Sequence, residues 1–211
     1  MTERLAAFTK AQTLADGDKP DEALEVISAY TSEEDAEYST TEMTIINLVI
    51  CEKLTSASFE DKKDACLEVL PIVEGVKILK DAAWLESYNE TVYDIFSKLS
   101  RCARDEQREE MWNRLKEIYY EITLAAKKVW KEKNALGGLT VYLNLSKLCK
   151  SYCDVADEDS FKMCETAAKE AKFCGKGRLD DDDWKDANKM IETIKKNISD
   201  AQHERELIKD V

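Results

Sequence analysis

The sequence contains few of the residues that interrupt helices. Its 211 residues include two prolines and six glycines, whereas charged residues make up 36% and hydrophobic residues 44%. Sheet proteins with many turns use more turn-forming residues than this, and disordered chains contain fewer apolar ones. The composition therefore predicts an all-α protein with enough apolar surface to form a core.

Long apolar runs and basic runs are also missing. No stretch approaches the roughly 18 apolar residues that span a bilayer, and the start MTERLAAFTKAQ is too charged for a secretory signal. The net charge of −13 would repel the phosphates of a nucleic acid. We therefore expect a soluble, cytoplasmic protein that binds neither nucleic acid nor membrane.

Histidine is scarce, and no two cysteines form a CxxC pair. The sequence has one histidine, His203, and seven cysteines spread along the chain. An odd number of scattered cysteines is typical of free buried thiols in a reducing compartment. Cys149 and Cys153 are four residues apart and could bind a metal together, but the further ligands of a zinc site are not visible. We expect neither a metal nor a cofactor.

Helical periodicity, by contrast, runs along the whole chain. Apolar residues recur every three or four positions in nine segments, which predicts nine amphipathic helices in antiparallel order. The first seven are expected over residues 3–16, 20–31, 39–54, 59–79, 85–99, 105–133 and 137–152. The last two carry their apolar residues over 161–171 and 184–198.

Several residues predict where helices begin, end or bend. Gly17 can end the first helix and Pro20 can open the second, which predicts a helical hairpin. Ser39 and Glu42 have the spacing of a capping box at the start of the third helix. Pro71 removes one backbone hydrogen bond and should bend the fourth helix.

No linker rich in proline, glycine or serine divides the chain. We therefore predict one helical domain over residues 1–200 and a polar tail over 201–211. Tetratricopeptide arrays also stack helical hairpins, but they repeat every 34 residues or so. The predicted helices are too unequal in length for a regular array of this kind. A tetratricopeptide-like scaffold that binds unphosphorylated partners is therefore only the alternative interpretation.

No motif declares catalytic chemistry. The stretch GKGR at 175–178 lacks the spacing of a phosphate-binding loop, and the four aspartates at 180–183 lack the alternation of a calcium loop. Both are typical of a loop followed by a helix start, where carboxylates oppose the positive end of the helix dipole. We predict that the protein is not an enzyme.

One predicted helix carries a coherent polar stripe. In GGLTVYLNLSKLCKSY, residues 137–152, the polar residues Thr140, Asn144, Lys147 and Ser151 recur at three-and-four spacing. Such a stripe either faces solvent or lines a groove. Lysines at the end of the preceding helix, including Lys128, suit the negative end of its dipole, or alternatively they attract an anionic peptide.

The second half of the chain resembles a known family. The segments YYEITLAAKKVWKE, GLTVYLNLS, ETAAKEA and WKDANKMIETIKKNI are similar, in order and spacing, to segments of the 14-3-3 family. The resemblance covers roughly residues 115–201 and is weaker over residues 1–55. It implies a nine-helix fold with a concave groove, dimerisation through the first helices, and an adapter function in which the groove binds phosphoserine or phosphothreonine peptides.

The resemblance also implies which residues bind the peptide. Asn144 and Asn197 match the two asparagines that hydrogen-bond the peptide backbone in the family, and an amide offers both a donor and an acceptor for this. Lys147 and Ser151 match positions in the groove wall, and Ile194 lies on the same predicted helix as Asn197.

The family's phosphate-binding residues are largely replaced. Where the family has DYYRYL this chain has TVYDIF, so that Asp94 stands in place of an arginine or a tyrosine, and Cys51 stands in place of a lysine. A carboxylate there would repel phosphate. If phosphate is bound, the cations we expect are Lys128, Lys53 and Lys147. The sequence thus predicts a non-enzymatic adapter for protein segments with a degenerate phosphate pocket.

Overall fold

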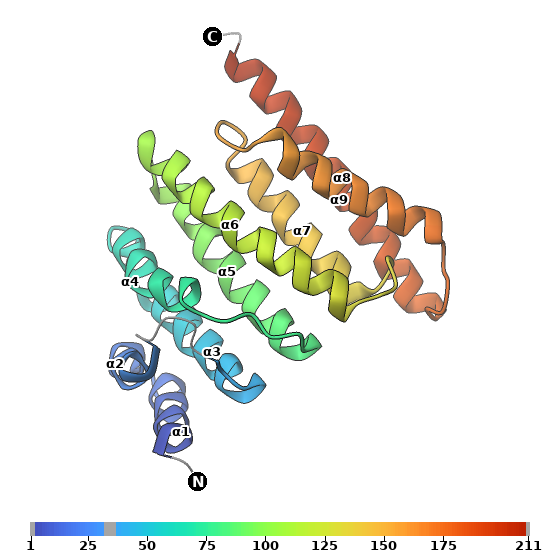
Figure 1. Cartoon of the computed structure of the whole chain (residues 1–211). Helices are drawn as coiled ribbons and strands as arrows, with labels where there is room; N and C mark the ends of the chain where they lie inside the picture. Colours follow the sequence, from blue (N-terminus) through green and yellow to red (C-terminus); the bar gives the residue numbers. More distant parts are fainter. Residues whose placement is uncertain (1–2, 32–36, 210–211) are drawn as a thin grey trace. The chain divides into compact units, whose positions relative to one another are not determined.

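A computed structural model describes residues 3–31 and 37–209 of the protein. Within these ranges the chain forms nine α-helices and no strands, as the periodicity predicts (Figure 1). The helices are α1 (Glu3–Asp16), α2 (Pro20–Thr31), α3 (Thr40–Ser56), α4 (Lys62–Glu74), α5 (Ala82–Cys102), α6 (Glu106–Val129), α7 (Leu136–Ser151), α8 (Glu158–Cys174) and α9 (Asp181–Lys209). Their lengths range from 12 residues in α2 to 29 in α9, unlike the equal helices of a regular repeat array.

The residues group into two compact units. The N-terminal unit, Met1–Cys102, contains α1 to α5, and the C-terminal unit, Ala103–Val211, contains α6 to α9. The single domain over residues 1–200 stays a prediction. The expected polar tail from residue 201 is helical as far as Lys209, because α9 continues through it, and residues 210–211 lie outside the described residues.

The hairpin between α1 and α2 forms as the sequence predicts, since α1 ends at Asp16, directly before Gly17. The left-handed backbone conformation falls on Asp18, with φ of 57°, and not on Gly17. Aspartate tolerates this conformation better than most residues with a side chain. Pro20 is the first residue of α2, as expected.

The capping box at the start of α3 is confirmed. The Ser39 side chain accepts a hydrogen bond from the Glu42 N–H, and the Glu42 carboxylate accepts one from the Ser39 N–H at 2.7 Å. Glu42 also forms an ion pair with Arg4 of α1 at 2.8 Å. The same carboxylate therefore caps α3 and ties α1 to it.

The fourth helix is much shorter than predicted. Phe59, expected at its start, is 82% exposed, and α4 runs from Lys62 to Glu74. Pro71 lies inside α4 and lacks the N–H that would continue the hydrogen-bond ladder, and Gly75 follows as the C-cap. The helix therefore ends within about one turn of the proline.

Helix α5 packs one apolar face into the core of the N-terminal unit. The predicted apolar stripe is buried as expected: Leu85, Tyr88, Val92, Ile95, Phe96 and Leu99. Two buried polar groups of α5 have partners: the indole of Trp84 donates to the Tyr38 carbonyl at 3.0 Å, and the Tyr88 hydroxyl donates to the Val73 carbonyl at 2.7 Å. These bonds link α5 to the segment before α3 and to α4.

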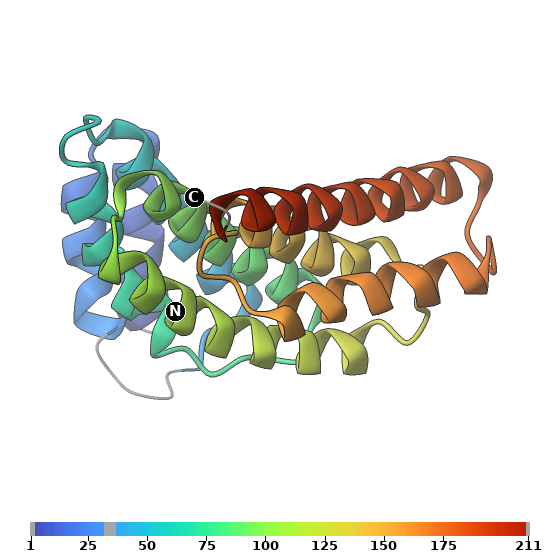
Figure 2. The ribbon, with the colours of Figure 1, turned by 90° about the horizontal axis from the view of Figure 1, so that it is seen from above.

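Helix α7 is the centre of the C-terminal unit, because α6, α8 and α9 all pack against it (Figures 1 and 2). The long helix α9 lies along α7 and α8. The core contains the apolar residues predicted for the last helices, with Phe161 and Ala168 from α8 and Ile191 and Ile198 from α9.

An arginine joins the beginning of α6 to the end of α7. The Arg108 guanidinium donates to both carboxylate oxygens of Asp154, at 2.8 and 2.7 Å, and to the Ser151 carbonyl at 2.7 Å. It also lies over the Tyr152 ring, 5.0 Å from the centroid. The hydrogen bonds with Arg108 lower the pKa of Asp154, whereas burial acts in the opposite direction.

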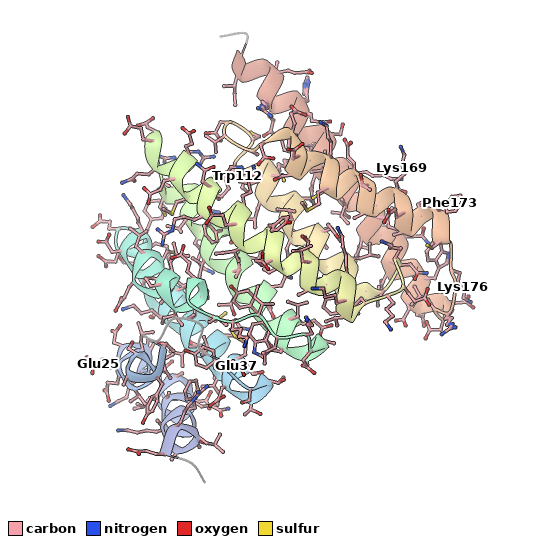
Figure 3. All side chains as sticks on the ribbon, viewed as in Figure 1. Glu25, Glu37, Trp112, Lys169, Phe173 and Lys176 are labelled. Carbon is pink, nitrogen blue, oxygen red and sulfur yellow. The ribbon has the colours of Figure 1, made fainter. Side chains whose placement is uncertain are left out.

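The cysteines are all free thiols, as predicted, but not all are buried. Cys66, Cys149, Cys153 and Cys164 are buried, whereas Cys174 at the end of α8 is exposed. Next to it, Phe173 is 94% exposed and projects away from α8 (Figure 3). Over residues 3–31 and 37–209, no helix is both long enough and apolar enough to cross a membrane.

Candidate functional site

The polar stripe of α7 exists as predicted, but its central amide is nearly enclosed. The hydroxyls of Thr140 and Ser151 donate to carbonyls of their own helix, at 3.0 Å each. Asn144 is 7% exposed, and its Oδ1 accepts a hydrogen bond from Lys147 at 3.5 Å. In this structure Asn144 therefore offers little surface to a ligand.

The second predicted amide, Asn197, contacts α7 from another side. Its Nδ2 donates to the Ser146 hydroxyl at 3.0 Å, and that hydroxyl donates in turn to the Leu143 carbonyl at 2.8 Å. Ser146 follows Asn144 by two residues, which corresponds to about 200° around the helix axis. No hydrogen bond in the described part of the chain joins Asn144 to Asn197. Their joint role in binding a peptide stays a prediction.

Ile194 must be removed from the predicted set of ligand-contacting residues. Its exposed fraction is 0%, and it lies on α9 between the buried residues Ile191 and Ile198. The three isoleucines recur at helical spacing on the face of α9 that packs in the core. Sequence similarity placed Ile194 on the correct helix, but the helix turns this side chain inward.

Two of the three predicted cations already have partners. Lys53 of α3 is bonded to Asp21 and, at 2.9 Å, to Glu68, and its side chain is 16% exposed. Burial acts to lower the pKa of Lys53, but the hydrogen bonds with both carboxylates outweigh it, so the pKa is raised and Lys53 stays charged. Lys147 bonds Asn144. Lys128 is exposed, and none of the hydrogen bonds or ion pairs found among the described residues involves it.

Cys51 and Asp94, which the sequence resemblance aligns with phosphate-binding residues of the 14-3-3 family, contact each other. The Cys51 thiol donates a hydrogen bond to the Asp94 carboxylate, at 3.2 Å between Sγ and Oδ2. Burial, this hydrogen bond and the Asp94 charge together raise the pKa of Cys51 to about 12. The thiol is therefore neutral. Asp94 also pairs with Lys98 at 3.8 Å, so a phosphate here would have to compete with a carboxylate for that cation.

The sequence did not reveal a groove between α6 and α8, which we call the α6–α8 groove. It has a volume of about 730 Å³. The lining residues used below are Lys116, Glu117, Tyr120 and Glu121 of α6, Leu145 of α7, and Asp157, Asp159, Ser160 and Met163 at the beginning of α8. Helices α6 and α8 each pack on α7, and Leu145 of α7 lies between them at the bottom of the groove.

Asp157 closes one end of the α6–α8 groove. Its carboxylate caps α8 through the Ser160 N–H at 2.9 Å and accepts hydrogen bonds from the Trp112 indole at 3.1 Å and Lys116 at 3.2 Å. Figure 3 labels Trp112 on the side of α6 near the start of α8. Burial acts to raise the pKa of Asp157, but these partners outweigh it and the pKa is lowered. The carboxylate therefore stays ionised and joins the start of α8 to the side of α6.

The open side of the groove exposes an aromatic ring between two carboxylates. Tyr120 is 55% exposed, and Glu117 and Glu121 lie three residues before it and one residue after it. The sequence does contain one signal for this site, the pair Glu117 and Glu121. Like charges at i and i+4 destabilise a helix unless a partner outside the helix compensates them. The same glutamates also fit an ordinary solvated face, so the sequence alone does not identify the groove.

The described ranges contain no candidate metal centre. There, no group of three or more histidine, cysteine, aspartate or glutamate side chains could hold a metal ion. Lys127, near the end of α6, lines a smaller hollow of about 50 Å³ with Trp130 and Glu170. The stretch GKGR forms the loop before α9, and Asn134 holds it by donating to the carbonyls of Gly175 and Lys176 at 2.8 and 3.0 Å.

Comparison with known families gives one match. A model described as a domain of unknown function, DUF7758, matches residues 36–153. The match covers more than half of the chain and includes α3 to α7, and so takes in Lys116, Glu117, Tyr120, Glu121 and Leu145 of the α6–α8 groove. No curated protein sequence matches the chain. The chain belongs to the family of the domain of unknown function DUF7758.

Proposed function

We propose that this protein is a non-enzymatic adapter that binds a segment of another protein in the α6–α8 groove. The observation that carries the proposal is an open groove of about 730 Å³ with an apolar bottom and a largely exposed tyrosine on its wall. Binding sites commonly have volumes of roughly 300–1,000 Å³ and combine apolar walls with a few polar groups. Tyrosine is enriched at protein interfaces because its ring adds apolar area and its hydroxyl adds a hydrogen bond.

We further propose that binding does not require phosphate, in contrast to the 14-3-3 family that the sequence resembles. By the resemblance, the neutral thiol of Cys51 stands in place of a lysine of that family, and Asp94 stands in place of an arginine or a tyrosine. The positive charge of Lys53 is balanced by its ion pairs with Asp21 and Glu68. A phosphate group needs charge-assisted hydrogen bonds, which Arg clusters supply best. These pairings support recognition of an unphosphorylated segment.

The resemblance adds two further parts to the proposal. It implies a homodimer or heterodimer formed through the first helices, which the mass of the purified protein in light scattering would test. A cytoplasmic site of action fits the seven free thiols, since a reducing compartment keeps such thiols from pairing.

The proposal is tested by titrating the protein with matched peptide libraries at two salt concentrations. One library carries phosphoserine or phosphothreonine at a fixed position and the other carries the unmodified residue. We expect equal or tighter binding of the unmodified library at low and high salt. A preference for phosphate that weakens as salt increases would contradict the proposal.

The location of the site is tested with two aromatic substitutions. Tyr120→Ala should weaken peptide binding, since it removes the exposed ring from the groove wall. Phe59→Ala is the matched control, because Phe59 is also an exposed aromatic residue, at 82%, and lies in the N-terminal unit. Equal binding by the two variants would show that the ligand binds elsewhere.

A further inference from the structure

The charges around the α6–α8 groove are predominantly negative. Four carboxylates lie on it, those of Glu117, Glu121, Asp157 and Asp159, against one cation, Lys116. Lys116 is already paired with Asp157 at 3.2 Å. The remaining three carboxylates give the groove a net negative charge. The whole chain, with a net charge of −13, has the same sign.

Two carboxylates of α6, those of Glu117 and Glu121, form no hydrogen bond or ion pair with the described residues. Glu117 and Glu121 are both exposed and are four residues apart, so they repel each other along the helix. None of the ion pairs or hydrogen bonds found over residues 3–31 and 37–209 involves either of them. Asp159 has a weak partner, Lys162 at 3.9 Å, and its side chain is 86% exposed. A ligand with positive charge would relieve this repulsion.

The groove also offers apolar contacts beside these charges. Leu145 is 2% exposed and forms the bottom, and Met163 and the ring of Tyr120 lie on the two walls. An apolar side chain of a ligand can be buried against Leu145 and Met163, because Met adapts its shape to such contacts. A guanidinium or ammonium group can then lie over the Tyr120 ring or pair with the adjacent glutamates.

We infer that the occupant of the α6–α8 groove is a lysine- or arginine-rich protein segment that carries an apolar anchor side chain. The inference rests on the proposed adapter function and names the chemistry of its partner. Anionic ligands, including phosphopeptides and acidic lipid surfaces, are repelled by the same carboxylates. Because the glutamates are exposed, their attraction should act mainly on the association rate and should weaken with salt.

The inference is tested with three libraries of 12-residue peptides in which the positions of the apolar residues are the same. The polar positions carry lysine and arginine in the first library, glutamine in the second, and glutamate in the third. Each library is titrated against the full-length protein by calorimetry at low and at physiological salt. We expect the basic library to bind at least about tenfold more tightly than the neutral one at low salt, and the acidic library not to bind.

Two double variants with the same change in charge separate the groove from the rest of the surface. In the test variant, Glu117→Gln is combined with Glu121→Gln. In the control, Asp182→Asn is combined with Asp186→Asn, which are exposed carboxylates on α9 with the same four-residue spacing. The test variant should bind the basic library about three- to tenfold more weakly, and the control should stay within about twofold of the unmodified protein. Circular dichroism verifies that both variants stay folded.

The outcomes distinguish this inference from the proposed function. Equal binding of the basic and neutral libraries, with both weakened by Tyr120→Ala, would overturn the inference and leave the adapter function standing. Basic peptides that bind the test variant and the control equally well would overturn the inference, because the attraction would then come from the general charge of the protein. No binding of any library by the unmodified protein would overturn both.

Discussion

The pair formed by Cys51 and Asp94 makes a quantitative prediction about cysteine reactivity. Burial and the neighbouring carboxylate raise the pKa of Cys51 from 9.0 to about 12. At pH 8 a thiol with a pKa of 9.0 is ionised in about one molecule in ten, whereas one with a pKa of 12 is ionised in about one in 10⁴. The thiolate is the reactive form, so the reactive population falls about 1,000-fold.

Part of this loss is offset by the greater nucleophilicity of a more basic thiolate. Three pKa units at a Brønsted coefficient of about 0.4–0.5 recover roughly 15- to 30-fold. The net expectation is that Cys51 reacts with iodoacetamide about 30- to 60-fold more slowly than an ordinary thiol at pH 8. The assay is alkylation over time, followed by peptide mass spectrometry, with the exposed Cys174 as the reference for reagent activity.

The substitution Asp94→Asn then tests the cause. It removes the charge next to Cys51, so the pKa of the thiol should fall and alkylation should accelerate about threefold for each pKa unit. Cys66 is the internal control, because burial raises its pKa to about 12 and Asp94 is not among the causes. Acceleration at Cys51 alone supports the reasoning. An unchanged rate at Cys51, or equal acceleration at Cys66, would refute it.

Three further predictions concern stability. Ser39→Ala removes the helix cap and should lower the free energy of unfolding by about 1 kcal/mol in urea titrations, and an unchanged midpoint would count against the cap. Arg108→Ala should cost about 1.5–3 kcal/mol, and it should also flatten the acid side of the stability profile. The pKa of Asp154 lies below 3.8 in the folded protein, so its contribution is full above about pH 4 and disappears as the pH falls further, which urea midpoints between pH 5 and 3 would measure. Gly177→Ala should cost about 1–2 kcal/mol by the same assay, since φ is +55° and the new Cβ would lie 3.2 Å from the Asn134 amide.

The secondary structure was largely predictable because the signals are local. The capping box of Ser39 and the apolar stripe of α5 depend on residues within a few turns of each other, and both were confirmed. The fourth helix was predicted too long because its apolar residues continue past Pro71 and Gly75, where the backbone no longer supports a helix. The sequence predicts only a bend at Pro71, whereas α4 ends three residues after it, at Glu74.

The candidate site was less predictable because it depends on contacts between helices. Motif similarity singled out Asn144 on α7 and Asn197 on α9, but the side of α7 that Asn197 approaches depends on how the two helices pack. Cys51 and Asp94 are 43 residues apart in the sequence, so their contact had no local signal. The α6–α8 groove exists because both helices pack on α7 and leave Leu145 between them. This packing of three helices cannot be read from any one segment of the sequence.

The exposed end of α8 has a practical consequence for measuring the oligomeric state. Cys174 is open to solvent and Phe173 beside it is 94% exposed, so two molecules can meet through their apolar rings with their thiols close together. Air oxidation would then join them by a disulfide and give a covalent pair with the mass of a dimer. A species that survives gel electrophoresis in detergent and vanishes on adding dithiothreitol is this oxidation product, and Cys174→Ser removes it without touching α1 or α2.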